Sequence, residues 1–245
     1  MEPDEYIVAV RRDAGALLAA ARTADPSARI AGCPGWSTVD LVWHIGVVHR
    51  FWCTVVAERL QQPPSDWPPE RPATDEDVFV FGEESATLLP AALAGGDASE
   101  PVWTWAPRKD VGFVQRRMAQ ETAVHRVDAE RAAGGDHRLD AELAADGIDE
   151  FLTLMLPAEI GKVLPEGASV HVHCTDTVRG GEWTVTRDPT GAPVVAADHT
   201  KADTALRGPA HDLLMLLWQR DELDDLDHVE VFGDRALAQR FVALG

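Results

Sequence analysis

Hydrophobic and polar positions follow a helical period from the start of the chain to about residue 157. Apolar residues recur every three or four positions, which is the spacing of one face of a helix. The predicted helices span 5–23, 37–61, 74–93, 112 to the glycine pair at 134–135, and 140–156. Ser37 followed by Asp40 is a typical helix start, because the hydroxyl can cap a free backbone N–H while the acid favours the positive helix end. Pro90 is expected to kink the third helix or to end it early.

The period changes after Gly167. Four short segments rich in β-branched residues are separated by glycine, proline or aspartate and therefore predict strands. They are 168–176, 182–188, 192–197 and 203–208. Apolar helices are expected at 209–220 and 233–244. The pattern predicts an α+β protein, with a helical domain at 1–157 and a smaller C-terminal α/β domain at 158–245.

Composition narrows the class of protein. The chain has 245 residues, of which 45% are apolar, enough to bury a core. The net charge of -19 argues against a nucleic-acid or anionic-membrane partner. The acidic start does not resemble a signal peptide, and no apolar run is long enough to span a bilayer. The three cysteines are scattered, which is typical of free thiols in a reducing cytoplasm.

Two predicted helices carry polar residues where core residues are expected. In 112–133, Glu121, His125 and Asp128 share one face at positions i, i+4 and i+7. In 37–61, His44 lies within the apolar stripe, whereas His49 lies off that stripe and is expected at the surface. A lone buried carboxylate costs several kcal/mol, so these groups need partners.

A divalent metal would supply that partner. Glu121 and His125 lie one turn apart on the same side of a helix, and His44 can add a third ligand from a neighbouring helix. Three protein ligands leave a position for water or substrate, which is the mark of a catalytic site. Asp128 can hold the other ring nitrogen of His125. The alternative is a core histidine bonded to Glu121, with Asp128 paired to Arg131 at the surface.

The segments CPGWSTVDLVWHIGVVHRFW and ETAVHRVDAERAAG also resemble the mycothiol-dependent maleylpyruvate isomerase family of actinobacteria. The resemblance covers nearly the whole chain and implies a DinB-like four-helix bundle followed by a small α/β domain. It implies a zinc ion, or another divalent metal, held by residues that map onto His44, Glu121 and His125, and the thiol cofactor mycothiol.

The chemistry follows from the metal. Zinc lowers the pKa of a bound thiol, so a thiolate can form at neutral pH and add to an electrophilic double bond. The expected function is therefore an isomerase or thiol transferase acting on a small electrophile such as a dicarboxylate. A metal-dependent hydrolase and a non-catalytic metal- or small-molecule-binding module remain the alternatives. The protein is expected to be a monomer or a homodimer.

Other residues are assigned by position. Arg207 and Arg220 are candidates to bind substrate carboxylates, and the resemblance places a functional arginine late in the C-terminal domain. Trp36 and Trp43 flank the metal-site histidine in sequence and can line the cofactor pocket, although core packing explains them equally well.

The segment HVHC at 171–174 is a possible second metal site. On a strand, His171 and His173 face one side, and a third ligand would have to come from His199 or His211. A strand with a half-polar face is the favoured interpretation, and the role of these histidines stays open.

Overall fold

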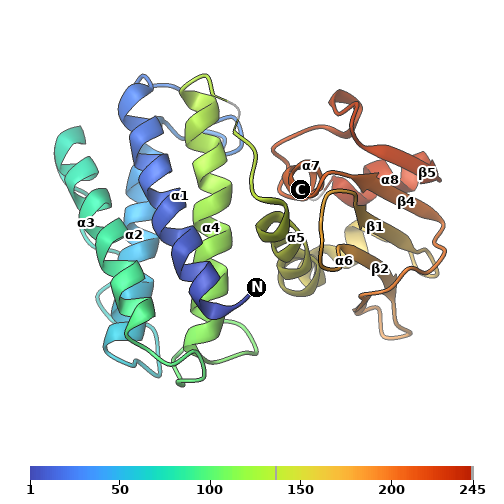
Figure 1. Ribbon diagram of the computed structural model, residues 1–245, viewed down its shortest axis with the longest axis horizontal. Coiled ribbons are helices and arrows are strands. Elements are labelled where there is room, and N and C mark those ends of the chain that lie inside the picture. The colour runs from blue at the N-terminus through green and yellow to red at the C-terminus, as the bar shows by residue number, and fades with distance from the viewer. Residues whose placement is uncertain (136, 244–245) are drawn as a thin grey trace. The chain divides into compact units, whose positions relative to one another are not determined.

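The computed structural model describes residues 1–135 and 137–243, so Leu244, at the end of the last predicted helix, lies outside the described residues. The chain forms two compact units, Met1–His137 and Arg138–Gly245 (Figure 1). Within the described part of the chain, no helix has the length and apolarity needed to cross a bilayer.

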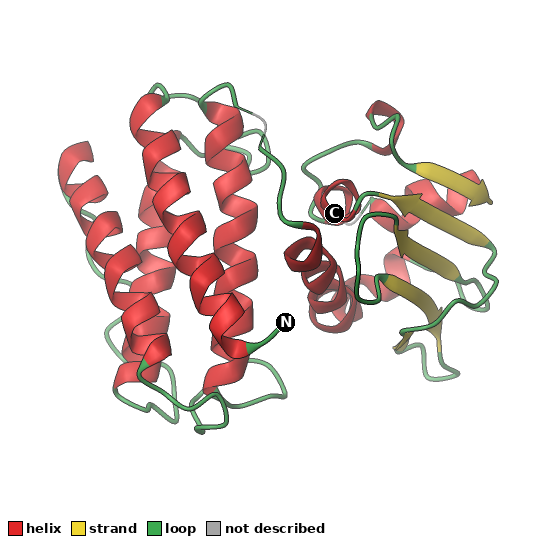
Figure 2. Cartoon of the chain, in the orientation of Figure 1, coloured by secondary structure: helices red, strands yellow, loops and turns green. Residues whose placement is uncertain are grey.

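The first unit is a bundle of four long helices, as Figures 1 and 2 show. They are α1 (Pro3–Thr23), α2 (Thr38–Ala57), α3 (Asp75–Ala94) and α4 (Val111–Ala132). Helix α1 packs against α3 and α4, and α2 packs against the same two helices. The predicted four-helix bundle is therefore confirmed, and α2 and α4 are neighbours within it.

Local sequence signals set the helix ends. Ser37 and Asp40 form a complete capping box at the start of α2. Asp110 caps α4 by accepting a hydrogen bond from the Phe113 N–H at 2.8 Å. Gly134, with φ of +79°, follows the end of α4 in a conformation that favours glycine. Pro90 was expected to kink α3 or to end it early; the early end is wrong, because α3 continues through Pro90 to Ala94. A proline there removes one N–H from the helical hydrogen-bond ladder.

Helices α2 and α3 approach closely at a pair of glycines. A Cβ on Gly46 would lie 2.9 Å from Phe81 Cδ1 and 3.3 Å from the Cα of Gly82. A side chain at Gly46 would therefore push the two helices apart. This close contact holds α2, which carries His44, against the bundle.

The second unit combines helices with a mixed sheet. Its helical elements are α5 (Ala141–Glu150), a π-helical turn (Phe151–Met155), α6 (Leu156–Val163), α7 (Ala210–Leu217) and α8 (Arg235–Val242). Its strands are β1 (Val170–Cys174), β2 (Glu182–Arg187), β3 (Pro193–Ala196), β4 (Thr204–Gly208) and β5 (Glu230–Gly233). The sheet order is β3-β2-β1-β4-β5, with β1 and β4 parallel and the other pairs antiparallel. The predicted α+β class is confirmed, and β5 is a strand that the sequence pattern did not indicate.

The division between the units comes earlier in the chain than the sequence pattern indicated. The expected boundary is residue 157, after the last helix predicted before the strands. In the structure α5 packs against α7, so it belongs with the second unit. Helical periodicity shows that a segment is a helix but not which neighbour buries its apolar face.

Candidate metal site in the helical bundle

Three predicted ligands converge between α2 and α4. Nε2 of His44 lies 3.0 Å from Oε1 of Glu121, and Nε2 of His125 lies 3.5 Å from the same oxygen. The two imidazole rings have their centroids 5.0 Å apart. One atom from each of the three side chains falls in a group whose members are all within 4.8 Å of one another. The structure thus brings together the residues that the helical faces selected.

These separations fit a bound cation. Ligand atoms at about 2.0–2.1 Å from a tetrahedral zinc ion lie roughly 3.3 Å from each other. The two measured separations from Oε1 of Glu121 bracket that value. Two imidazoles and one carboxylate are also a donor set that zinc accepts, with a position left open.

Further polar groups hold the ligands in place. Nδ1 of His125 lies 2.9 Å from Oδ2 of Asp128, which is almost fully buried. Arg117 donates to Oε2 of Glu121 at 2.7 Å, which directs the other oxygen toward the histidines. A carboxylate behind a histidine fixes the tautomer that presents Nε2 as a lone pair.

The charges in the site favour a cation. Burial opposes ionisation of Glu121, but hydrogen bonds with His125 and His44 and the charge of Arg117 outweigh it and hold the pKa of Glu121 well below its usual value. Burial also disfavours a charged His125, but hydrogen bonds with Asp128, Cys33 and Glu121 raise its pKa well above the usual value. Without a metal ion the carboxylates therefore favour a proton on His125, and a metal ion that binds Nε2 would have to displace that proton.

The two tryptophans expected at the site lie in different places. The Trp36 ring has its centroid 4.7 Å from that of His44 and 6.2 Å from that of His125, and it stacks on the second ring at 23°. Trp43 instead packs against Phe81 of α3, with centroids 5.0 Å apart. Trp36 forms a wall of the site, and the contacts of Trp43 are those of a packing residue.

The surface position expected for His49 is wrong. Its side chain is fully buried, and its Nε2 lies 2.8 Å from Oγ1 of Thr122. Because the Thr122 hydroxyl donates to the Met118 carbonyl at 2.6 Å, Nε2 of His49 is the donor to Thr122. Burial lowers the pKa of His49 to about 4, so the ring is neutral at neutral pH.

Two neighbours of the site were not assigned from the sequence. Arg117 precedes Glu121 by four residues, and that spacing was the available signal. The thiol of Cys33 lies 3.8 Å from Oδ2 of Asp128, because the loop before α2 returns to α4. Arg126, next to His125, turns away from the site and pairs with Glu130 at 3.0 Å.

The two candidate arginines both belong to the second unit. Arg207 lies on β4 and pairs with Glu230 at 2.5 Å. Arg220 follows α7 and donates to the Trp218 carbonyl at 2.8 Å. Their assignment to substrate binding stays a prediction.

A four-helix bundle that brings two histidines and a glutamate together, followed by a small α/β unit, defines a two-domain protein of the DinB-like bundle class. The profile of the mycothiol maleylpyruvate isomerase N-terminal domain matches residues 7–130, and that of the MDMPI C-terminal domain matches residues 142–240. The chain belongs to the mycothiol-dependent maleylpyruvate isomerase family, which is a family of enzymes.

Solved structures show the same fold. A crystal structure of the mycothiol-dependent maleylpyruvate isomerase is 14% identical, with a TM-score of 0.64 over 94% of this chain and 93% of that one. A histidine-to-alanine mutant of the isomerase is 13% identical, with a TM-score of 0.58 over 88% of each chain. A comparison with curated proteins gives no match.

Proposed function

We propose that the chain is a zinc-dependent enzyme that uses mycothiol to isomerise a small electrophile or to transfer the thiol to it. One observation carries the proposal: the ligand atoms of His44 and His125 lie 3.0 and 3.5 Å from a single oxygen of Glu121. A zinc ion held there would lower the pKa of a thiol that reaches its open position, and the thiolate could add reversibly to an electrophilic double bond. Membership of the family supports mycothiol as that thiol.

The protein's own residues shape the site around this chemistry. Glu121 contributes one negative charge against the two positive charges of the metal, so a thiolate would complete neutrality. Asp128 keeps the proton on Nδ1 of His125, and Arg117 holds the second oxygen of Glu121. The indole of Trp36 covers both imidazoles on one side and limits the access of water.

Substrate recognition is proposed for the second unit. A substrate with carboxylates needs positive partners, and guanidinium groups bind carboxylates through paired hydrogen bonds. Arg207 already pairs with Glu230 and Arg220 already donates to the Trp218 carbonyl, so either guanidinium group would have to share or exchange these contacts to bind a substrate carboxylate.

The test is elemental analysis of the purified full chain beside His44→Ala and the matched control His228→Ala. His228 is an exposed histidine outside the bundle site. We expect His44→Ala to lose one metal equivalent and the control to lose none. Equal metal content in all three proteins would contradict the metal assignment.

Mycothiol titration of the cobalt-substituted protein then tests the thiol. A sulfur-to-cobalt charge-transfer band is expected in the wild type and should be absent in His44→Ala. If no band forms and esters or amides are hydrolysed, the enzyme is a hydrolase that activates water. If ligand is retained without turnover, the site is a binding module.

A further inference from the structure

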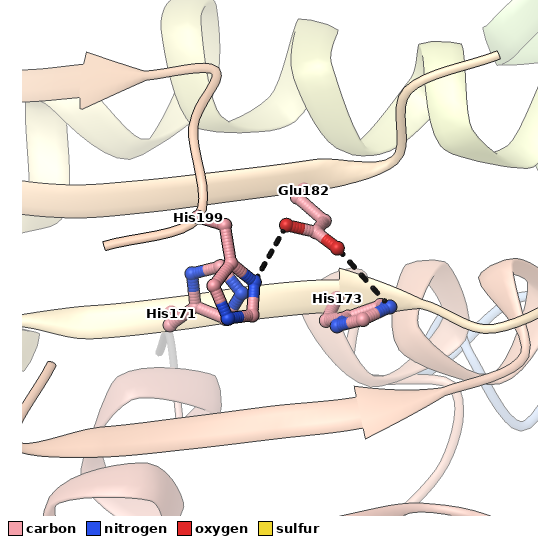
Figure 3. Close-up of side chains that lie close together, drawn as sticks. All are labelled: His171, His173, Glu182 and His199. Atoms are coloured by element: carbon pink, nitrogen blue, oxygen red, sulfur yellow. Dashed lines mark hydrogen bonds and ion pairs between the residues drawn. The ribbon is translucent and has the colours of Figure 1, made fainter. Parts of the chain in front are cut away.

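A second group of histidines gathers on one face of the sheet, in a different unit from the bundle site. His171 and His173 alternate with Val172 and Cys174 along β1, so both imidazoles lie on the same face. Glu182 of β2 stands opposite His173 in the strand register. His199, from the segment between β3 and β4, completes the group, as Figure 3 shows.

The contacts centre on the Glu182 carboxylate. Oε1 of Glu182 lies 3.3 Å from Nε2 of His173, and Oε2 lies 2.8 Å from Nδ1 of His199 (Figure 3). The His171 ring has its centroid 5.1 Å from that of His199 and 6.0 Å from that of His173. One ligand atom from each of the four residues lies within 4.8 Å of the other three.

His171 gives an independent indication of a missing partner. Its Nε2 is buried and has no hydrogen-bond partner among the residues that the structure describes. Its Nδ1 lies 3.3 Å from Oγ1 of Thr184, the residue opposite it on β2. With Nδ1 as the donor to Thr184, Nε2 carries a lone pair that a buried site normally satisfies.

The arrangement around His171 is the one that accompanies metal-bound histidines. A second ring nitrogen that donates to an oxygen fixes the tautomer and directs the other nitrogen at the ion. With Nδ1 engaged by Thr184, Nε2 is the nitrogen that His171 can offer to an ion.

The neighbouring charges allow a cation. Glu182 contributes a carboxylate within the group, and the charge of Asp198 acts on His171 from the adjoining loop. Arg207 of β4 is in register with His173 on the other side of β1, but its guanidinium pairs with Glu230 at the edge of the sheet. The charge of Arg207 is therefore already balanced by its own partner.

We propose that His171, His173, Glu182 and His199 form a second site for a divalent transition metal such as zinc. Three imidazoles and a carboxylate are a donor set that zinc, cobalt and nickel accept. Four protein ligands close the coordination shell, which is typical of a structural metal. The ion would fasten the loop 197–203 to the sheet through His199.

Assembly of the site needs only small movements. The spread of up to 4.8 Å must contract to the roughly 3.3 Å expected between the ligands of a tetrahedral zinc ion. His171 is held by the central strand, whereas the side chains of His199 and Glu182 are 75% and 30% exposed and can turn. A hydrogen-bonded polar network would explain the Glu182 contacts, but it leaves Nε2 of His171 unsatisfied.

The experiment uses the full chain with His44→Ala, which weakens the bundle site. The protein is stripped with a chelator and titrated with Zn²⁺ and with Co²⁺. We expect one equivalent to bind, with the visible absorption of tetrahedral cobalt. Adding His199→Gln or Glu182→Gln should weaken binding at least tenfold, since even partners outside the coordination shell alter metal affinity by roughly 10- to 100-fold. Adding His228→Gln should change nothing.

Two results would overturn the proposal. One is the absence of stoichiometric binding in the His44→Ala protein. The other is a binding constant unaffected by His199→Gln and Glu182→Gln, which would place the ion elsewhere, such as at the remaining bundle ligands. Because His199 is exposed, its substitution leaves the core intact, and circular dichroism of the metal-free variants checks the fold. The outcome does not depend on the thiol chemistry proposed for the bundle site.

Discussion

At the residue scale, Asp128 is the side chain on which the geometry of His125 depends. It is 3% exposed and its Oδ2 lies 2.9 Å from Nδ1 of His125. Asp128→Asn keeps the shape but removes the charge, so we expect metal affinity in the bundle to fall roughly 10- to 100-fold. Chelator competition measures the change, and Asp66→Asn, at an exposed position outside the helices, is the control. Unchanged metal affinity in Asp128→Asn would contradict a role of the Asp128 carboxylate in positioning His125.

His49 supports the fold rather than the metal. Its side chain projects from α2 and is fully buried against Thr122 of α4. Truncating this side chain to alanine would leave a cavity and remove the hydrogen bond to Thr122. His49→Ala should lower the free energy of unfolding by about 1–3 kcal/mol, measured by urea denaturation. The exposed His228→Ala should change it by less than about 0.5 kcal/mol. A loss of bound metal in folded His49→Ala would show that His49 has a further role.

The residues differ in how well the sequence identified them. His44, Glu121 and His125 stood out because polar groups on a packing face need a partner. His49 is also polar and is more deeply buried than His44, yet it was placed at the surface, because α2 buries a broader face than one narrow stripe. Trp43 lies next to His44 in sequence, but a helix turns about 100° per residue, so its ring reaches α3 instead.

At the scale of elements, the start of α2 positions His44. Hydrogen bonds from the Ser37 backbone N–H, Arg71 and the Ser37 hydroxyl lower the pKa of Asp40 from 3.8 to about 2. A carboxyl whose pKa is lower in the folded state stabilises the fold above about pH 4 and loses that contribution as the pH falls toward 2.

Asp40→Asn should therefore destabilise the protein at pH 6 by about 0.5–2 kcal/mol, the usual range for a lost helix cap. The gap between wild type and variant should close as the pH falls from 4 to 2. Urea unfolding across this pH range measures it, with Asp66→Asn as the control. A gap that does not depend on pH would mean that the carboxylate charge does not stabilise α2.

Local sequence signals predicted most of the helices and strands, but they did not predict which of these elements pack against one another. Capping residues and glycine pairs predicted the four bundle helices closely, because caps act within one turn. The strand β5 has a short and mostly exposed pattern, which resembles a loop. The sequence pattern grouped α5 with the bundle helices, whereas it packs against α7, because an amphipathic helix can bury its apolar face on any facing surface.

At the scale of the whole molecule, the two units have separate cores and carry separate candidate metal sites. All three bundle ligands, together with Asp128 and Arg117, lie within Met1–His137. A protein of residues 1–137 should therefore fold cooperatively and bind one metal ion within about threefold of the affinity of the full chain. Circular dichroism and zinc titration measure this. If the fragment does not unfold cooperatively, the bundle depends on the second unit for its stability.

Substrate binding, in contrast, is expected to need the second unit. Arg220→Ala should raise KM for a dicarboxylate substrate about tenfold or more, since a charged hydrogen bond contributes about 1.5–3 kcal/mol. Metal content should not change. The exposed Arg235→Ala, on α8, is the matched control. An unchanged KM in Arg220→Ala would contradict the proposal that Arg220 binds a substrate carboxylate.

The sequence by itself determined the helices and most strands, the bundle class and the three residues that meet in the bundle, because periodicity, caps and misplaced polar groups are local properties of a chain. Only the tertiary structure decided which face of α2 is buried, where α5 belongs, and that Glu182 and His199 join His171 and His173. These depend on contacts between residues far apart in the chain, and such contacts are set by packing, which a single sequence pattern does not encode.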